Sequence, residues 1–104
     1  MAVVSVYCIF ANAAEADRIG QIVIEERLAA CINILAPCRS IYRWRGAVET
    51  IEEVPAILKT AAHQADNLIA RIAGLHSYEV PAITVWPIDK LLASYAEWVE
   101  GAAC

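Results

Sequence analysis

One stretch, Val3-Val4-Ser5-Val6-Tyr7-Cys8-Ile9-Phe10, is apolar at almost every position. The side chains of a strand alternate between its two faces, so a strand that is apolar at both phases is buried on both sides. We therefore expect residues 3–10 to form a central strand of a sheet. Both faces of that sheet then need a covering layer.

The residues that follow this strand predict a helix. Asn12 is placed to act as its N-cap, with Glu15 at the capping-box position. Apolar residues then recur at helical spacing, and the charged residues, Glu15 among them, are expected mostly on the opposite face. Gly20 lies inside this helix, where glycine costs about 1 kcal/mol relative to alanine. Close packing of the helix against a strand is the expected reason for this glycine.

Turn signals divide the rest of the chain into further elements. Strands are predicted at 30–35, 40–45, 48–60 and 82–87, and helices at 63–75 and 89–100. Proline has no N–H to donate to a sheet, so Pro37 predicts a bend or bulge and Pro55 predicts an edge strand or a bulge. Arg45-Gly46 fits a tight hairpin turn, because glycine adopts positive φ at little cost.

The predicted order is β-α-β-β-α-β-α, within a single domain that spans 1–104. Its first six elements are those of the ferredoxin-like β-α-β-β-α-β unit, and the last is an additional C-terminal helix. This is an α+β fold, in which two helices cover one face of an antiparallel sheet. The other face stays uncovered although its strand residues are apolar, so that face needs a partner.

The composition also indicates a partner. Hydrophobic residues make up 60% of the chain and charged residues 19%, and a chain this short cannot bury so much apolar surface by itself. A spanning helix needs about 20 apolar residues, whereas the best run, 2–14, is interrupted by Ser5 and Asn12. We therefore expect an oligomer that does not contact a membrane. No targeting segment is visible, which predicts a cytoplasmic location.

Charge and residue counts argue against two other classes of function. The net charge is −4, whereas a nucleic-acid-binding domain carries a basic surplus, so no nucleic-acid partner is expected. A cysteine nucleophile would need a histidine partner and an oxyanion site. The chain has two histidines, four glycines and no Gly-rich phosphate loop. We expect neither an enzyme nor an organic cofactor.

Five segments together carry a more specific pattern. They are 26–34 (ERLAACINI), 40–46 (SIYRWRG), 57–60 (ILKT), 75–81 (LHSYEVP), and the pair Tyr95 and Trp98. In order and spacing they resemble the signatures of the CutA divalent-cation tolerance family, over almost the whole chain. The resemblance implies a ferredoxin-like protomer that assembles into a homotrimer, with hairpin strands pairing between subunits.

The resemblance further implies a role in the response to metal ions, by binding copper or another divalent metal. The matching positions are Cys31 and His76, and Cys8 is a third candidate because a cysteine on the first strand recurs in some members. Thiolate and imidazole are suitable ligands for copper and zinc. The alternative is that these cysteines, with Cys38 and Cys104, are buried small hydrophobes or free thiols.

The family also places a cleft between subunits, and the matching residues are Trp44, Lys59, Tyr78 and Glu79. The trimer would resemble the PII signalling proteins. The alternative function is therefore a signalling or interaction trimer that binds a small ligand or an unidentified protein partner in this cleft. A purely structural role is the other interpretation, with Lys59 and Glu79 as an interface ion pair beside a packed Trp44.

An acidic run follows the predicted turn. Glu49, Glu52 and Glu53 could attract divalent cations, but a solvated hairpin surface is the simpler interpretation. On that interpretation they meet Arg43 and Arg45 across the ladder.

Overall fold

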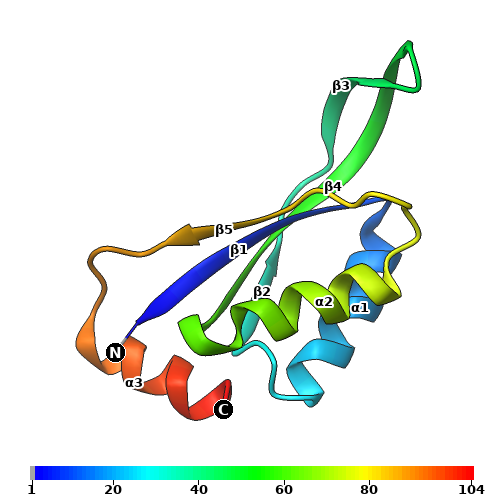
Figure 1. Cartoon of the computed structure of the whole chain (residues 1–104). Helices are drawn as coiled ribbons and strands as arrows, with labels where there is room; N and C mark the ends of the chain where they lie inside the picture. Colours follow the sequence, from blue (N-terminus) through cyan, green and yellow to red (C-terminus); the bar gives the residue numbers. More distant parts are fainter. Residues whose placement is uncertain (1) are drawn as a thin grey trace.

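The computed structural model describes residues 2–104 and has the predicted α+β fold (Figure 1). All strand pairs in its sheet are antiparallel. The elements are β1 (Val3–Phe10), α1 (Ala13–Glu25), β2 (Cys31–Ile34), β3 (Cys38–Trp44), β4 (Ala47–Ala61), the 3-10 turn η1 (Ala62–Gln64), α2 (Ala65–Leu75), β5 (Ile83–Pro87) and α3 (Ala93–Ala102). The predicted fold class is confirmed. The last two helices begin later than expected, since η1 precedes α2 and α3 begins at Ala93 instead of residue 89.

Strand β1 is central, as its sequence predicts. The sheet order is β2-β4-β1-β5, with β3 paired to β4. Helices α1 and α2 lie side by side on one face of this sheet (Figure 1), and Val6, Cys8 and Phe10 of β1 are fully buried in the core beneath them. Gly20 of α1 has the predicted close contact, because a Cβ built there would lie 3.1 Å from two side-chain carbons of Ile32 in β2.

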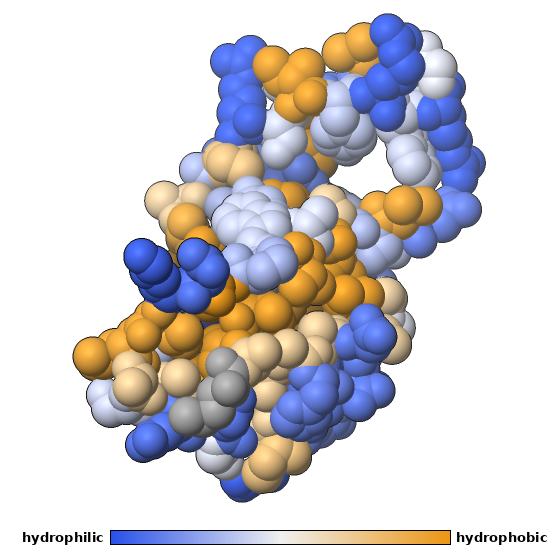
Figure 2. All heavy atoms as spheres, turned by 60° about the vertical axis from the view of Figure 1, so that its left-hand side comes forward, coloured by the Kyte–Doolittle hydropathy of each residue, from blue (hydrophilic) through white to orange (hydrophobic). Residues whose placement is uncertain are grey.

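The opposite face of the sheet is covered only at one end. Helix α3 packs there through Ala96 and Val99 against Val3, in a small separate cluster. Farther along, the ring of Tyr7 stacks on Trp86, with 4.8 Å between ring centroids, and Trp86 remains 47% exposed. Hydrophobic side chains gather on the side of the molecule shown in Figure 2. We call the uncovered part of the sheet face that carries Tyr7 and Trp86 the open face.

Strands β3 and β4 form a hairpin that projects from the body (Figure 1). The amino-terminal half of β4 pairs only with β3, and the carboxyl-terminal half pairs with β1 and β2. The predicted turn is confirmed, since Arg45 and Gly46 have φ values of 50° and 83°. Every residue from 41 to 50 is exposed.

A one-residue bulge separates β2 from β3. Ile34 pairs with Ala56 and Cys38 pairs with Glu53, so three residues, 35–37, lie opposite two. This confirms the irregularity predicted at Pro37. Of the two alternatives predicted from Pro55, the bulge is confirmed and the edge strand is wrong, because β4 has partners on both sides there. The carbonyl oxygen of Pro55 accepts from Leu35 N at 3.0 Å. Because the carbonyl and the nitrogen of one strand residue point to the same side, the nitrogen of Pro55 also faces the bulge, where the ladder is already interrupted.

The start of α1 differs from the prediction in one respect. Asn12 is the N-cap and its side chain accepts from Glu15 N at 2.8 Å. The Glu15 carboxylate, however, accepts from Ala11 N at 3.0 Å, one residue before the N-cap, and its second oxygen accepts from Ser77 N at 2.9 Å. Glu15 is therefore buried instead of lying on the polar face. It ties α1 to the loop that follows α2.

Candidate functional site

The three predicted metal ligands lie in three different environments. Cys8 and its neighbour in register, Ala56, point into the core under α1 and α2. Cys31 pairs in register with Lys59, one residue out of phase with the core positions of β4, so it lies on the open face. His76 follows α2 and stacks on Phe10, with 5.4 Å between ring centroids. The sheet thus separates Cys8 from Cys31.

Cys8 is poorly prepared to bind a metal. Its side chain is fully buried. Burial, with a smaller contribution from the charge of Glu15, raises the pKa of the Cys8 thiol to about 12. Metals bind the thiolate, so a thiol that stays protonated at neutral pH is a weak ligand. The alternative interpretation, that this cysteine packs as a small hydrophobe, agrees with this environment.

His76 uses both of its ring nitrogens within the fold. Tyr78 N donates to Nδ1 at 3.0 Å, which leaves the proton on Nε2. Nε2 then donates to the carbonyl of Ile9 at 2.8 Å. The side chain is fully buried, and Nε2 lies 3.7 Å from the Glu15 carboxylate. A metal could bind this ring only after one of the two hydrogen bonds had broken.

Cys31 is the most accessible of the three. It is half-buried on the open face, and its Sγ lies 3.5 Å from the hydroxyl of Tyr95 in α3. Burial, together with the neighbouring Cys31, raises the pKa of Tyr95 to about 12, so this phenol stays protonated. Within residues 2–104 of one protomer, no three histidine, cysteine or acidic side chains are grouped as a metal site would require.

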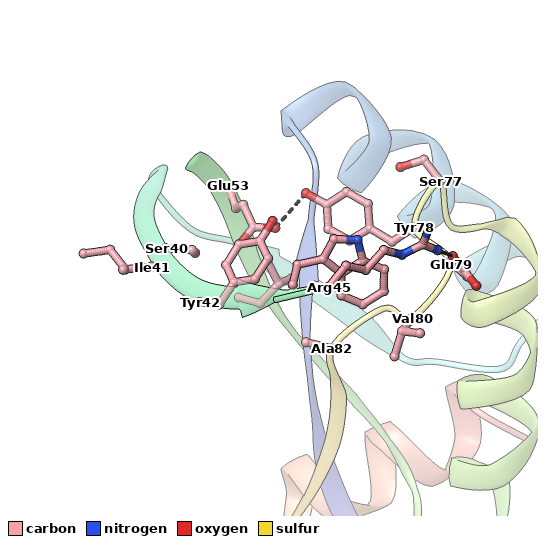
Figure 3. A pocket seen from close by; sticks show the side chains of 12 residues that line it. Ser40, Ile41, Tyr42, Arg45, Glu53, Ser77, Tyr78, Glu79, Val80 and Ala82 are labelled. Carbon is pink, nitrogen blue, oxygen red and sulfur yellow. Dashed lines mark hydrogen bonds and ion pairs between the residues drawn. The ribbon is translucent and has the colours of Figure 1, made fainter. Parts of the chain in front are cut away.

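The predicted cleft residues are largely brought together. A cavity of about 850 Å³ lies between the hairpin and the loop after α2 (Figure 3). Its walls include Trp44, Tyr78 and Glu79, three of the four residues expected at a cleft between subunits, whereas Lys59 lies away from it near the carboxyl end of β4. Its aromatic and charged walls also include Tyr42, Arg45 and Glu53.

Glu53 is the polar centre of this cavity. Its carboxylate accepts from the hydroxyl of Tyr78 at 2.6 Å (Figure 3), and the residue is only 6% exposed. Burial, followed by the hydrogen bond to Glu53 and its charge, raises the pKa of Tyr78. Tyr78 is therefore a neutral donor to the Glu53 carboxylate. The prediction that Glu53 belongs to a solvated surface is wrong, because the loop after α2 covers it.

The ion pairs also differ from the expected ones. The hairpin register places Val48 opposite Arg43 and Glu52 opposite Arg39. Arg45 reaches out of the hairpin instead and binds the carboxylate of Glu79 at 2.6 Å, with both side chains more than two-thirds exposed. An exposed pair of this kind stabilises a fold by about 0–1 kcal/mol. Its effect is to join the tip of the hairpin to the loop across the cavity.

The sequence analysis placed Glu53 on a solvated hairpin surface, although the turn contains the signal for its true position. A two-residue turn at 45–46 makes Trp44 the partner of Ala47 and, by counting outward, Tyr42 the partner of Glu49 and Cys38 the partner of Glu53. Residues that are partners, or two apart on a strand, share a face. The aromatic residues of β3 and the acidic residue of β4 could thus have been assigned to one surface.

Known proteins share this architecture. The family model for the CutA1 divalent ion tolerance protein matches residues 4–102. The chain belongs to the CutA family. It is 40% identical over 84 residues to the divalent-cation tolerance protein CutA of Thermus thermophilus, covering 81% of this chain and 82% of that protein. The CutA protein of Pyrococcus horikoshii is 38% identical over 94 residues, covering 90% and 91%.

Solved CutA structures superpose over nearly the whole chain. CutA1 from Oryza sativa has a TM-score of 0.95 at 32% identity and covers 100% of this chain and 95% of that one. A CutA from Archaeoglobus fulgidus described as periplasmic has a TM-score of 0.94 at 29% identity, covering 98% and 99%. CutA is a divalent-cation tolerance family and not a known enzyme family. Within residues 2–104, no helix has the length and apolar character needed to cross a membrane.

Proposed function

We propose that this chain forms a homotrimer that serves in divalent-cation tolerance by binding copper or another divalent metal ion. Family membership supports the tolerance role, since the matching relatives are named for it. Trimer and metal are our inferences for this chain, and each has its own physical support. We place the protein in the cytoplasm, which fractionation of the producing cells would test.

The assembly is supported by the amount of apolar surface that a single protomer leaves exposed. Large hydrophobic side chains are at least a third exposed at ten positions: Ile34, Leu35, Ile41, Tyr42, Trp44, Val48, Val80, Trp86, Leu92 and Trp98. Most lie on the hairpin and near the open face. Monomeric proteins rarely expose so much contiguous apolar surface, and the unpaired edges of a projecting hairpin invite strands of other copies. Association would cover both.

Cys31 is the residue through which we propose that metal is bound. It lies on the open face, which association would bring near other copies, whereas Cys8 is buried and His76 is already hydrogen-bonded. One thiol is not a metal site, so side chains of neighbouring copies would complete the coordination. A soft thiolate favours copper or zinc over magnesium or calcium.

Native mass spectrometry of the reduced protein tests both parts. We expect the mass of three chains and uptake of copper ions in multiples of three. Cys31→Ser should abolish the uptake and keep the trimer. Cys104→Ser is the matched control, because this thiol is exposed near the end of the chain and should leave uptake unchanged. A monomer would refute the assembly, and full uptake by Cys31→Ser would refute the site.

The cavity supports a second candidate function, which is the binding of a small ligand or a protein partner. The specific observation is a buried carboxylate, Glu53, at the centre of a cavity lined by aromatic side chains. Ligand sites commonly combine apolar walls with a few convergent polar groups. A trimer that ignores copper but retains a small molecule through purification would favour this function.

A further inference from the structure

One carboxylate in the cavity wall has no cation beside it within the protomer. Glu53 is 6% exposed and accepts a hydrogen bond from Tyr78 (Figure 3). Among residues 2–104, no lysine, arginine or histidine side chain lies within 4.0 Å of its carboxylate. The guanidinium in the same wall, Arg45, binds Glu79 instead. Association of protomers would exclude the remaining water, and a carboxylate that is buried without a counter-charge is costly.

The open face carries the opposite charge. Lys59 is in register with Cys31 on one side and Ser5 on the other, so its side chain lies on the open face and not in the core. It is half-buried, and in the described part of the chain no carboxylate lies within 4.0 Å of its ammonium group. A copy that covered the open face would bury this cation, which would then need an acceptor of its own.

The other basic side chains do not share this position. Among residues 2–104, every other lysine and arginine is exposed. Arg39 is in register with Glu52, on the face of the hairpin opposite to Glu53, and Lys90 precedes α3. The remaining arginines already donate to a carbonyl or a carboxylate of their own protomer: Arg18, Arg27, Arg43, Arg45 and Arg71.

A ring of identical copies needs two different surfaces on each protomer. In a cyclic trimer, every contact joins one patch of a copy to another patch of the next. Both charges lie on one face of β4, because its odd-numbered residues keep that face from Lys59 to Glu53. Six residues of a strand span about 20 Å, so the two side chains of one protomer cannot meet. Each is left to pair with a neighbouring copy.

The cavity has walls that suit a lysine side chain. They include the rings of Tyr42, Trp44 and Tyr78, and the faces of aromatic rings attract ammonium groups. Lysine can lay its methylene stem along apolar surface while its charged end reaches a polar group. The Glu53 carboxylate is a suitable acceptor for that charged end.

We propose that in the trimer Lys59 of one copy enters the cavity of the next copy, where its ammonium group binds the carboxylate of Glu53 beside the rings of Tyr42, Trp44 and Tyr78. This contact rests on the trimer of the proposed function and makes a second copy the occupant of the cavity. It is an alternative to the small ligand or foreign protein of the second candidate function. Because it joins two different patches, three such pairs close the ring.

Subunit exchange between intact trimers measures this contact. Unlabelled and isotope-labelled trimers are mixed, and native mass spectrometry follows the appearance of mixed trimers. Glu53→Gln keeps an acceptor for the Tyr78 hydroxyl and removes the negative charge, and Lys59→Gln removes the positive charge. Removing one partner of a buried charge pair speeds dissociation, so each variant should exchange about tenfold faster than wild type or more.

The double variant distinguishes a direct contact from two separate effects. If the side chains touch, the second substitution removes no further contact. Glu53→Gln combined with Lys59→Gln should then exchange about tenfold more slowly than the product of the two separate effects, or slower still. Lys90→Gln is the matched control, because it removes the same charge from an exposed lysine. It should exchange at the wild-type rate, and its effect should simply multiply with that of Glu53→Gln.

Failure of the contact and failure of the assembly give different results. A wild-type trimer whose Lys59→Gln variant exchanges no faster than Lys90→Gln would overturn the contact and leave the trimer standing. This comparison decides the matter even if Glu53→Gln does not fold. Effects of Glu53→Gln and Lys59→Gln that simply multiply would overturn the contact as well. A wild-type monomer would refute the proposed assembly, and the contact with it.

Discussion

Glu15 offers the sharpest test of how this fold holds its functional loop. Its two carboxylate oxygens accept from Ala11 N at 3.0 Å and from Ser77 N at 2.9 Å, and the residue is 7% exposed. Glutamine at this position has nearly the same shape but only one oxygen. In Glu15→Gln, one backbone N–H would therefore face the amide NH₂, a second donor, and would lose its partner.

The expected loss follows from these contacts. A hydrogen bond to a charged group is worth about 1.5–3 kcal/mol, and an unpaired buried donor costs about 1–3 kcal/mol. We therefore expect Glu15→Gln to lower the free energy of unfolding by about 2–4 kcal/mol per protomer. Urea unfolding at a fixed protein concentration would measure it. Glu25→Gln, an exposed change in the same helix, is the control and should stay within about 0.5 kcal/mol of wild type.

The pH dependence of this loss provides a second check. Burial alone would raise the pKa of Glu15, but hydrogen bonds from Ser77 and Ala11, together with His76, lower it below its usual value. A carboxyl group whose pKa is lower in the folded state contributes stability above its unfolded pKa, about 4.3, and loses it as the pH falls further. The difference between wild type and Glu15→Gln should therefore shrink below about pH 4. A difference under 0.5 kcal/mol at pH 7, or one that grows in acid, would refute the reasoning.

Three further predictions concern other sites. At pH 8 a thiol reagent should label the exposed Cys104 rapidly and leave Cys8 unmodified until the protein unfolds, because burial raises the pKa of Cys8 to about 12. Equal labelling rates of Cys8 and Cys104 in the folded protein would contradict this. Thr60→Val should destabilise by about 1–2 kcal/mol in urea unfolding, since it removes a buried 2.7 Å hydrogen bond to the carbonyl of Leu28; no change would refute this role. Gly46→Ala should cost about 1 kcal/mol from its positive φ alone, because nothing lies within 4 Å of the added carbon, and a loss above about 3 kcal/mol would contradict this.

The fold could be predicted because its signals are local. The apolar run in β1, the cap at Asn12 and the turn at Arg45-Gly46 each specify an element from a few neighbouring residues. The order of those elements then limits the topology to few choices. Even Gly20 was interpretable, because glycine inside a helix has few explanations other than close packing.

The candidate site was harder to predict because it depends on contacts between distant segments. Cys8 and Cys31 look alike in sequence, each within an apolar strand, and only the register of β4 shows that they face opposite sides of the sheet. The hydrogen bonds that occupy His76 join residues 67 positions apart in one case. Pro55 left both an edge strand and a bulge open for a similar reason, because the irregularity that accommodates it lies in the facing segment.

The bulge at 35–37 determines which side chains meet Glu53. Strand β4 is continuous, so its odd-numbered residues keep one face from Lys59 to Glu53. In the facing segment, the extra residue of the bulge shifts the register by one. Strand β2 therefore presents odd-numbered residues to that face and β3 presents even-numbered ones. Without the bulge, the register of β2 would continue and the odd-numbered residues of β3, which include Arg39 and Arg43, would share the face of Glu53. With the bulge, Tyr42 and Trp44 take that place on the face that carries Glu53.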